Sequence, residues 1–456
     1  MTIESDFQYE TTIPVTAHYE TIVIGGGWAG VTAACASARK GAKTLLIEKS
    51  NCLGGNATQA LVGPFMPFSV KDKPLVKGIF QDIRDDVVLR EGASGESRGF
   101  DVEILKQVLN ETVEKYDVEL LLHTALIDVV KEGRTVKGAL IHNKSGLQLV
   151  TADYFIDTSG DADLVHLAGG QYVVGRKEDG LTQAMTKMFK IANVNMDEVI
   201  QYCQSNSEHF MFIEDEELVS IAGFKDLVKE YKNKGEFPLP QDYIFFVSTN
   251  RRDEVLVNTT RVVLKSGISG SDITAAELES LNQAHAVMNV LKNEVPGMER
   301  AYISTTGSHI GIRETRRIVG DYVLTRDDVL YARKFHDAIT HGAYPIDIHN
   351  PKGEGGELTD IKENEYYDIP YRSLVPVDFD NVLVAGRCLS ATHSAHSSAR
   401  IQATCAAMGE AVGTAAGIAS EQKISVREVD LSSLQKYLHE HGHIVKPDYV
   451  ERVEVT

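Results

Sequence analysis

One stretch near the start of the chain, residues 19–50 (YETIVIGGGWAGVTAACASARKGAKTLLIEKS), most constrains what the protein can fold into. Residues 21–24 read as a buried strand, residues 29–39 as a helix that Gly41 ends, and residues 43–47 as a second strand. Strand, helix and strand in this order form a βαβ unit, whose two strands are parallel. The sequence therefore predicts an α/β protein built on a parallel sheet.

Three glycines and one acid within this stretch predict what the unit binds. Gly25, Gly27 and Gly30 follow the first strand as Gly-x-Gly-x-x-Gly, and Glu48 ends the second strand. Gly25 permits a tight turn, Gly27 lets the backbone approach a pyrophosphate, and Gly30 lets the helix pack on the strand. The helix N-terminus offers N–H groups to an anion, and Glu48 can accept hydrogen bonds from a ribose. A purely structural turn is the alternative, but the combination favours dinucleotide binding.

The remainder of the chain divides into a middle segment and a return to the first pattern. Residues 118–163 alternate β-rich runs with turn signals, which predicts an antiparallel meander ending in another strand. A long middle helix is expected to begin near the capping-box pattern of Thr274 and Glu277 and to end near Pro296. Residues 381–420 again read as strand, glycine turn and small-residue helix, so the two ends of the chain are expected to share one sheet.

With 456 residues the chain exceeds one typical core, which agrees with two domains. We predict a Rossmann-like dinucleotide-binding domain, with a parallel sheet plus an antiparallel meander, formed by residues 1–170 and 372–456. An α+β substrate domain, residues 171–371, is inserted into it.

Composition argues against several partners and locations. The 65 acidic and 46 basic residues give a net charge of −19, spread without a long basic tract, so nucleic acid is not an expected partner. Five widely spaced cysteines without a CxxC pair suit a reducing compartment. The first 20 residues lack the apolar core of a signal peptide, which predicts a cytoplasmic location.

The last helical segment is the least polar part of the chain. Its glycines Gly409, Gly413 and Gly417 are four residues apart, a spacing that in lipid indicates a helix-pairing face. Because Arg400 and Glu410 interrupt the apolar run, we expect no membrane span and attribute the glycines to close helix packing.

Four separated segments resemble the FAD-dependent oxidoreductases of the glutathione-reductase-like flavoprotein superfamily. They are GGGWAG with Glu48, the doublet in CLGGNATQ, the strand ending in FIDTSGDAD, and VLVAGR before the last helix. A closer resemblance, to a family of uncharacterised FAD-dependent oxidoreductases, is carried by GIRETRRIVGDYVLT and AGRCLSATHSAHSSARIQAT. The resemblance implies FAD as cofactor, and GGNATQ offers no histidine that would tether it, so we expect non-covalent binding. It implies the following cofactor-binding residues: Gly25, Gly27, Gly30, Glu48, Gly54, Gly55, Asn56, Ser159, Gly160, Asp161, Gly386 and Arg387.

The third of the FAD-binding motifs departs from its relatives. Many relatives have Gly-Asp where this chain has Gly386-Arg387, so Arg387 is expected to face either phosphate or substrate. No second Gly-x-Gly-x-x-Gly follows a strand in the middle segment, where flavin disulfide reductases keep an NAD(P)H domain. The electron partner therefore has no motif of its own.

Candidate catalytic residues come from two segments. His396 and Arg400 are four apart at the start of the last helix, so both are expected to project beside the flavin. Their spacing is similar to the HGANR type of segment in fumarate reductase and succinate dehydrogenase flavoproteins, which implies a substrate with a carboxylate or carbonyl. Arg313 is the preferred member of a second, charge-dense segment that can attract an anion. In the structural alternatives, His396 bonds backbone, Arg400 caps carbonyls and Arg313 pairs with Glu314.

Histidines three apart, His393 and His396, have a spacing available to a metal, but no third ligand follows, so we expect no metal site.

The predicted function is hydride transfer between flavin N5 and a small polar, carboxylate- or carbonyl-bearing metabolite. An oxidase or monooxygenase that uses O2, or a flavoprotein subunit of a larger electron-transfer complex, are the alternatives. The expected partner is a small-molecule substrate, and a homo-oligomer is compatible with the sequence.

Overall fold

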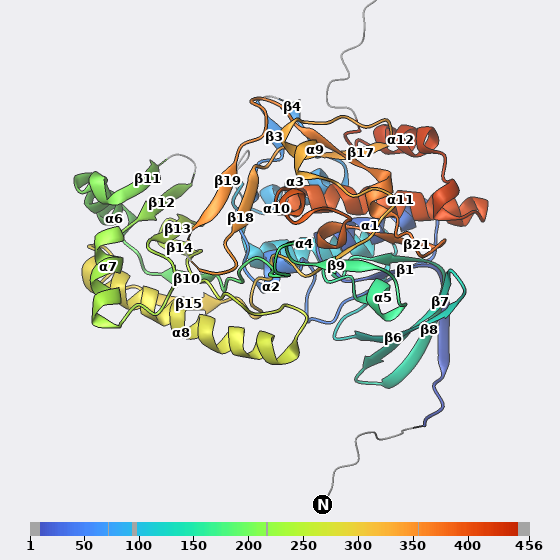
Figure 1. Cartoon of the computed structure of the whole chain (residues 1–456), viewed down its shortest axis with the longest axis horizontal. Coiled ribbons are helices and arrows are strands. Elements are labelled where there is room, and N and C mark those ends of the chain that lie inside the picture. The colour runs from blue at the N-terminus through green and yellow to red at the C-terminus, as the bar shows by residue number, and fades with distance from the viewer. Residues whose placement is uncertain (1–9, 72, 94–97, 216–217, 354, 446–456) are drawn as a thin grey trace, which may run out of the picture.

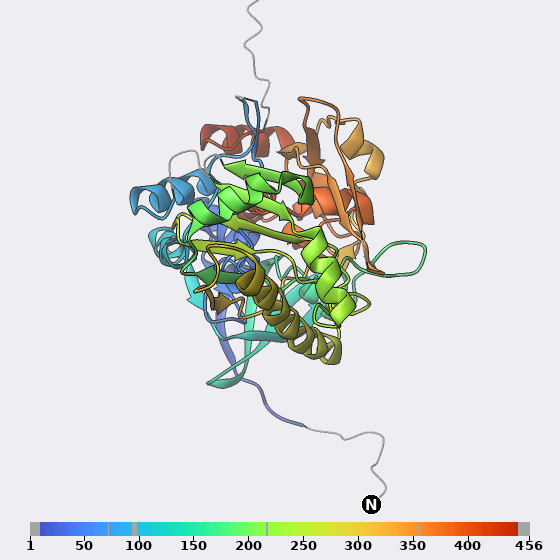
Figure 2. The ribbon, with the colours of Figure 1, turned by 90° about the vertical axis from the view of Figure 1, so that its left-hand side faces the viewer.

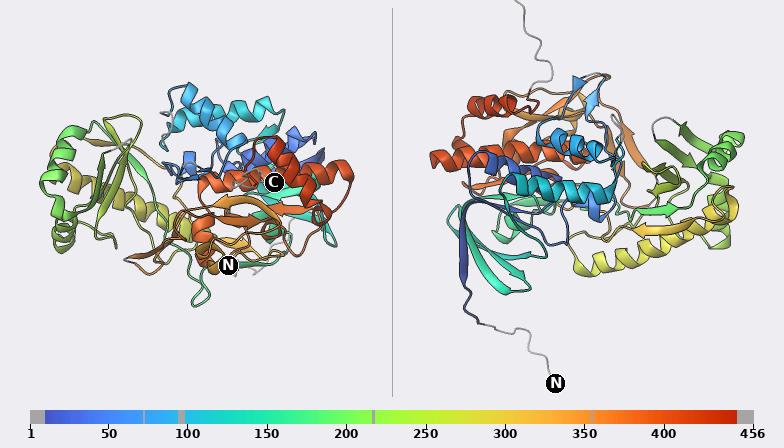
Figure 3. Two further views of the ribbon diagram at one scale, coloured as in Figure 1. Left: turned by 90° about the horizontal axis from the view of Figure 1, so that it is seen from above. Right: turned by 180° about the vertical axis from the view of Figure 1, so that it is seen from behind.

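The chain folds into two units, each with its own sheet (Figure 1). The structure is a computed structural model that describes residues 10–71, 73–93, 98–215, 218–353 and 355–445. The smaller unit, drawn in green and yellow, extends from one side of the larger unit (Figures 1 and 3). The outer ends of the predicted ranges 1–170 and 372–456 lie outside the described residues.

The sheet of the larger unit combines parallel and antiparallel strands. Its strands are, in spatial order, β5 (Glu119–Leu121), β2 (Thr44–Ile47), β1 (Val15–Ile24), β8 (Gly146–Asp157), β7 (Thr135–Asn143) and β6 (Ala125–Glu132), with β21 (Val382–Val384) also paired to β8. The pairs formed by β5, β2, β1, β8 and β21 are parallel, whereas β6, β7 and β8 form the predicted antiparallel meander. The predicted α/β class is confirmed.

The first and last strands join this sheet as the sequence predicted. Helix α1 (Trp28–Arg39) connects β1 to its parallel neighbour β2, which confirms the βαβ unit. All four residues of β2 are buried, because both faces of a parallel sheet are covered. Strand β21 pairs with the end of β8, so the two ends of the chain share one sheet.

Two helices rich in small residues lie against each other on this sheet. They are α1 and α11 (Gln402–Gln422). A Cβ atom on Gly409 would lie 2.1 Å from the carbonyl oxygen of Ala29, and one on Gly413 would lie 2.1 Å from that of Ala33. The glycine spacing therefore serves close packing, as predicted. Among the described residues, no helix is long and apolar enough to cross a membrane.

The smaller unit is an antiparallel sheet with three helices, which confirms the predicted α+β character. Its strands are, in order, β11 (Phe210–Asp215), β12 (Val219–Gly223), β13 (Ile244–Ser248), β14 (Glu254–Val257), β10 (Phe189–Ala192) and β15 (Tyr302–Thr306). Its helices are α6 (Met196–Ser205), α7 (Lys225–Lys234) and α8 (Gly270–Glu294). Figure 2 shows this sheet and the long helix α8 facing the viewer.

Helix α8 begins one turn earlier than predicted. Its N-cap is Ser269, whose side chain accepts a hydrogen bond from the backbone N–H of Asp272. Thr274 lies inside the helix, where its hydroxyl donates to the carbonyl oxygen of Gly270 at 2.8 Å. The capping-box pattern at Thr274 was therefore wrong as a start signal, because the serine cap precedes it.

The hydrophobic cores divide the chain at other points than the predicted boundaries at residues 171 and 371. The buried core of the smaller unit draws on residues from Phe189 to Ala301. Ile318, Tyr367 and Tyr371 instead belong to the core of the larger unit. The boundaries at residues 171 and 371 stay a prediction.

Short elements complete the larger unit and connect it to the smaller one. The helices are α2 (Asn56–Gln59), α3 (Ile79–Leu89), α4 (Val102–Lys115), α5 (Asp163–Leu167), α9 (Arg326–Leu330), α10 (His393–Ala399) and α12 (Leu431–Glu440). The strands form the pairs β3 (Ser69–Val70) with β4 (Lys73–Pro74), β9 (Tyr172–Val174) with β16 (Arg316–Ile318), β17 (Ala338–Gly342) with β20 (Tyr367–Pro370), and β18 (Ile346–His349) with β19 (Gly356–Thr359).

Candidate active site

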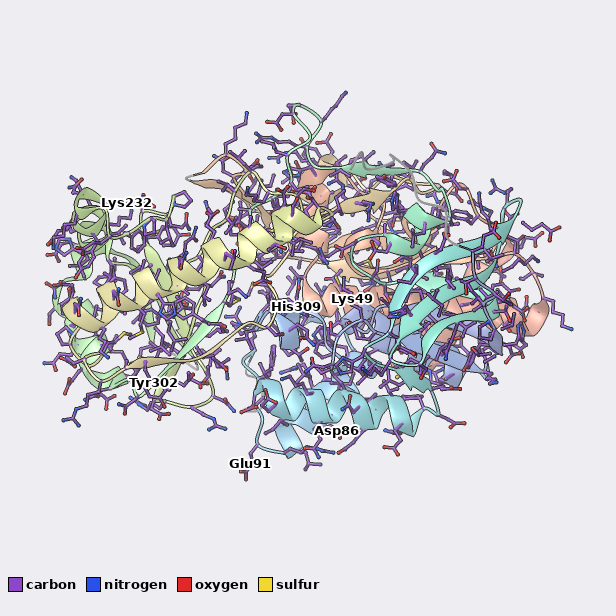
Figure 4. The ribbon with its side chains drawn as sticks, turned by 90° about the horizontal axis from the view of Figure 1, so that it is seen from below. Lys49, Asp86, Glu91, Lys232, Tyr302 and His309 are labelled. Carbon is purple, nitrogen blue, oxygen red and sulfur yellow. The ribbon has the colours of Figure 1, made fainter. Side chains whose placement is uncertain are left out.

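A cavity of about 370 Å³ lies between the two units, beyond the carboxyl ends of strands β1, β2, β8 and β21. Open α/β sheets place their ligands at this edge. All predicted cofactor residues except Gly30 line the cavity, namely Gly25, Gly27, Glu48, Gly54, Gly55, Asn56, Ser159, Gly160, Asp161, Gly386 and Arg387. Lys49 and His309, which also line it, lie near the middle of the molecule in Figure 4.

The glycine loop after β1 is shaped by contacts that leave no room for side chains. Gly25 has a φ of +102°, and a Cβ on it would lie 2.6 Å from the carbonyl oxygen of Thr158. Gly30 does not line the cavity; a Cβ there would lie 1.7 Å from the carbonyl oxygen of Gly25. Gly27 is the N-cap of α1 and has no side-chain cap, so the first N–H groups of the helix stay available to an anion.

Glu48 is buried against this loop. Its Oε2 accepts a hydrogen bond from the backbone N–H of Gly26 at 2.6 Å, and its Oε1 accepts one from the N–H of Ser50 at 2.7 Å. Each carboxylate oxygen can accept a further bond. The side chain is thus held in place with acceptor capacity left for ribose hydroxyls.

Arg387 brings an uncompensated donor to the same part of the cavity. Its Nη2 donates to Asp161 Oδ1 at 3.3 Å. The same nitrogen packs against Gly160 so closely that a Cβ on Gly160 would lie 2.4 Å from it. Its Nη1 is buried and has no hydrogen-bond partner among the described residues. A buried guanidinium N–H without a partner is unfavourable unless a ligand accepts from it. The structure places Arg387 beside Gly160 and Asp161, and its contact with phosphate or substrate stays a prediction.

A second helix also begins at the cavity. The N-cap of α11, Ile401, has no side-chain cap and lines the cavity together with Gln402. Gln402 ties the two helix starts together, because its Oε1 accepts from Trp28 Nε1 at 2.8 Å and its Nε2 donates to the carbonyl oxygen of Val62 at 2.6 Å. Two positive helix ends therefore face one cavity. The glycine loop, the buried acid, the free arginine N–H and the helix ends together fit a large cofactor rich in oxygen and phosphate.

The cavity lining also includes two arginines from the predicted catalytic set, Arg313 and Arg400. Arg313 donates through Nη1 to the carbonyl oxygen of Ala184 and to Thr186 Oγ1, both at 2.7 Å. Burial and the nearby charge of Arg400 lower the pKa of Arg313 to about 9. The side chain of Arg400 makes no hydrogen bond to a described residue, and its buried Nε has no partner. Both guanidinium groups can therefore receive an anion.

His396 does not reach the cavity. It is fully buried, and its Nε2 lies 3.0 Å from the carbonyl oxygen of Arg387. His396 and Arg400 do share the last turn of α10, since the N–H of Arg400 donates to the carbonyl oxygen of His396 at 3.1 Å, but the His396 ring is buried against Arg387 whereas Arg400 lines the cavity. Burial and the charge of Arg317 hold the pKa of His396 well below its ordinary value, so the ring is neutral.

The other charged residues near Arg313 pair with protein groups. Glu314 is buried in contact with Arg317 and also accepts from His393 Nδ1. Arg316 donates to Asp163 Oδ1 at 3.0 Å. Only Arg313 of this arginine cluster lines the cavity. In the part of the chain that the structure describes, no group of three or more metal-ligating side chains is arranged to hold a metal ion.

Three polar side chains that the sequence did not single out lie beside Arg400. They are Tyr344, Asp347 and His349, and all three line the cavity. The Tyr344 hydroxyl donates to Asp347 Oδ2 at 3.1 Å, and His349 Nε2 lies 3.3 Å from the same oxygen. Asp347 and His349 alternate along strand β18, so both face one side of it. The alternation of Asp347 and His349 in the sequence IDIH is the one feature from which these residues could have been predicted.

A βαβ unit whose glycine loop and terminal acid open into a cavity is the arrangement that holds the ADP part of a dinucleotide. The class defined by fold and site is thus that of dinucleotide-dependent enzymes. Residues 20–438 match the family of FAD dependent oxidoreductases, and the chain belongs to this family. FAD is the cofactor of this family, and the site described above fits it.

Individual curated relatives match a smaller part of the chain than the family as a whole does. The chain is similar to a digeranylgeranylglycerophospholipid reductase of Picrophilus torridus, with 26% identity over 40% of this chain and 48% of that protein. It is also similar to a fumarate reductase (cytochrome) of Shewanella frigidimarina, with 28% identity over 31% of this chain and 33% of that protein. The matches thus span half or less of these curated relatives. A geranylgeranyl bacteriochlorophyll reductase-like protein of Thermoplasma acidophilum aligns over 95% of this chain and 94% of its own, with 11% identity and a TM-score of 0.45.

Proposed function

We propose that the protein transfers a hydride between FAD and a small substrate that carries a carboxylate, and that Arg313 and Arg400 bind this carboxylate. FAD, when bound, supplies the group that accepts or releases the hydride. The protein binds and orients the substrate, keeps water from the reacting atoms and moves the accompanying proton.

The observation that carries this proposal is the pair of uncommitted guanidinium groups on one wall of the cavity. Arg313 uses one nitrogen for the protein, and Arg400 uses none. Burial and the charge of Arg400 lower the pKa of Arg313 to about 9, and Asp347, 4.0 Å from Arg400, is one carboxylate beside two guanidinium groups, so one positive charge is left for an anion. Guanidinium groups bind planar carboxylates through paired hydrogen bonds, so a carboxylate would satisfy both the charge and the donors.

We further propose that the glycine loop, Glu48 and Arg387 hold the FAD in the same cavity. Gly25, Gly27 and the start of α1 would lie against its phosphates, and Glu48 would bind a ribose. Arg387 would donate its free Nη1 to the pyrophosphate. Support for this assignment comes from the absence of room for side chains in the glycine loop and from the buried donor of Arg387.

The experiment is anaerobic bleaching of the flavin band by a panel of hydroxy acids, polyols and amines. Enoates are tested by reoxidation of the reduced enzyme. We expect only carboxylates to react, and Arg400→Gln to weaken their binding by about a hundredfold, as for a lost charged hydrogen-bonded pair. Arg252→Gln, at an exposed arginine of the smaller unit, is the matched control and should leave binding unchanged.

Three results would contradict the proposal. Reaction with uncharged polyols alone, unaffected by Arg400→Gln, would remove the carboxylate from the assignment. Oxygen consumption with peroxide release on substrate addition would instead favour an oxidase or monooxygenase. If no metabolite reduces the flavin of the isolated protein, the electron-transfer subunit becomes the better explanation.

A further inference from the structure

The described contacts of the Asp347 carboxylate all involve one of its two oxygens. Its Oδ2 accepts from the Tyr344 hydroxyl at 3.1 Å and lies 3.3 Å from His349 Nε2 and 4.0 Å from Arg400 Nη2. No described residue donates to Oδ1. The side chain is 22% exposed and lines the cavity. Oδ1 is therefore an acceptor available to a ligand beside the two arginines.

His349 is fixed as a neutral donor toward Asp347. Arg261 Nη2 lies 3.1 Å from His349 Nδ1, and because arginine only donates, Nδ1 must be the acceptor. Arg261 is itself held by the carbonyl oxygens of Gly353 and Gly355, at 3.0 and 2.7 Å. The single N–H of the ring is thus on Nε2, facing Asp347. Burial and the charge of Arg313 lower the pKa of His349 to about 4, which agrees with a neutral ring.

Asp347 itself is ionised at neutral pH. Burial alone would raise its pKa, but the hydrogen bond from His349 and the charges of Arg400 and Arg313 hold the pKa below its usual range. The two arginines and Asp347 then sum to one positive charge. A monoanion complements this wall, and a zwitterion leaves it unbalanced.

We propose that the substrate is a hydroxy acid whose carboxylate lies between Arg313 and Arg400 and whose hydroxyl donates to Asp347 Oδ1. This inference rests on the proposed function and adds the chemical class of the substrate and its proton acceptor. FAD, when bound, would supply the hydride acceptor; Asp347 would take the hydroxyl proton as the hydrogen on the same carbon leaves with its bonding pair and the C–O single bond becomes a carbonyl. Asp347 then releases the proton to water. His349 and Arg261 are positioning residues.

The test compares binding of matched acids with and without the hydroxyl. The oxidised holoenzyme is mixed anaerobically with lactate or propionate, and with malate or succinate, and the rapid change in flavin absorbance reports binding before any reduction. In the wild type we expect the hydroxylated acid to bind about tenfold more tightly, as for one hydrogen bond to a charged group. In Asp347→Asn this preference should fall toward one, while propionate binds at least as tightly as before. Flavin reduction should slow by about a hundredfold or more.

Glu357→Gln is the matched control. Glu357 lies opposite Ile348 in the same hairpin, so its side chain faces away from the side of Asp347, and it does not line the cavity. It should leave both binding and reduction unchanged. An Asp347→Asn protein that keeps the hydroxyl preference would overturn the inference, and so would a preference for amino acids in the wild type. A wild type that binds none of these acids would instead refute the proposed function.

Tyr344→Phe tests the same assignment if Asp347→Asn does not fold. Loss of one donor to Oδ2 should raise the pKa of Asp347, whose other neighbours are the neutral His349 and the charged Arg400 and Arg313. The acid limb of the pH profile for flavin reduction should therefore move to higher pH. A profile that keeps its position would contradict Asp347 as the proton acceptor.

Discussion

Replacement of Gly30 by alanine tests whether close contact between the glycine loop and α1 shapes the cofactor site. The added Cβ would lie 1.7 Å from the carbonyl oxygen of Gly25 and 2.8 Å from Thr158 Oγ1. Neither neighbour is the end of a flexible side chain, so the loop and the helix must move apart. Helix propensity alone predicts the opposite effect, a gain of about 1 kcal/mol for alanine over glycine.

The size of the effect follows from the hydrogen bonds that hold the loop. The N–H of Gly25 donates to the carbonyl oxygen of Ile47 at 2.7 Å, and the N–H of Gly26 donates to Glu48 at 2.6 Å. Each such buried bond, when broken, destabilises by about 1–3 kcal/mol. After subtraction of the helix gain, we expect Gly30→Ala to lower the free energy of unfolding by about 3 kcal/mol.

Urea unfolding of the apoprotein, followed by circular dichroism, measures this change, and the FAD-to-protein ratio after purification reports the site. Gly270→Ala is the matched control, because nothing lies within 4 Å of a Cβ at that first position of α8. It should leave stability unchanged or slightly higher. A Gly30→Ala protein with wild-type stability and a full complement of FAD would refute the reasoning.

Two further predictions concern a donor and a buried acid. Arg387→Gln should raise the dissociation constant of FAD by about tenfold or more, because the uncommitted Nη1 is lost; fluorescence titration of the folded apoprotein measures this, and unchanged affinity would contradict it. For Glu410, burial would raise the pKa, but His443 and Arg39 hold it below its ordinary value. It therefore stabilises the fold above its unfolded pKa of about 4.3, and this contribution is lost as the pH falls through the lower folded pKa. Glu410→Gln should lower stability at pH 7 and flatten its decline below about pH 4 in urea unfolding at several pH values; parallel curves would contradict it.

The cofactor side of the cavity could be predicted because its determinants are local. Gly25, Gly27 and Glu48 lie within one βαβ unit, where the spacing of residues along the chain sets their spacing in space. The pairing of β21 with β8 is long-range, yet the repeated order of strand, glycine turn and helix at the two ends of the chain indicated it. The assignment of the cofactor-binding residues to FAD came from the resemblance, and the contacts of these residues with FAD stay a prediction.

The charge-dense segment shows where spacing stops being informative. Arg313, Arg316 and Arg317 lie within five residues of one another, and no local rule separates a ligand-binding arginine from a structural one. The difference arises because Glu314 and Asp163 pair with the other two. Arg313 was the correct member to prefer for a place in the cavity, although its binding role is untested.

The substrate side could not be predicted from local spacing because its chemistry depends on residues far apart in the chain. His396 and Arg400 have the expected helical spacing, but the His396 ring is buried with its Nε2 3.0 Å from the carbonyl oxygen of Arg387, a contact that spacing does not predict. Asp347 had no such pattern, because its ionisation and hydrogen bonding depend on Arg400 and His349. The neutral form of His349 in turn requires Arg261. A carboxylate within reach of two arginines would ordinarily be only their counter-ion. Here two other donors occupy one of its oxygens and leave the second to the cavity, and this asymmetry distinguishes an acceptor for substrate from a structural ion pair.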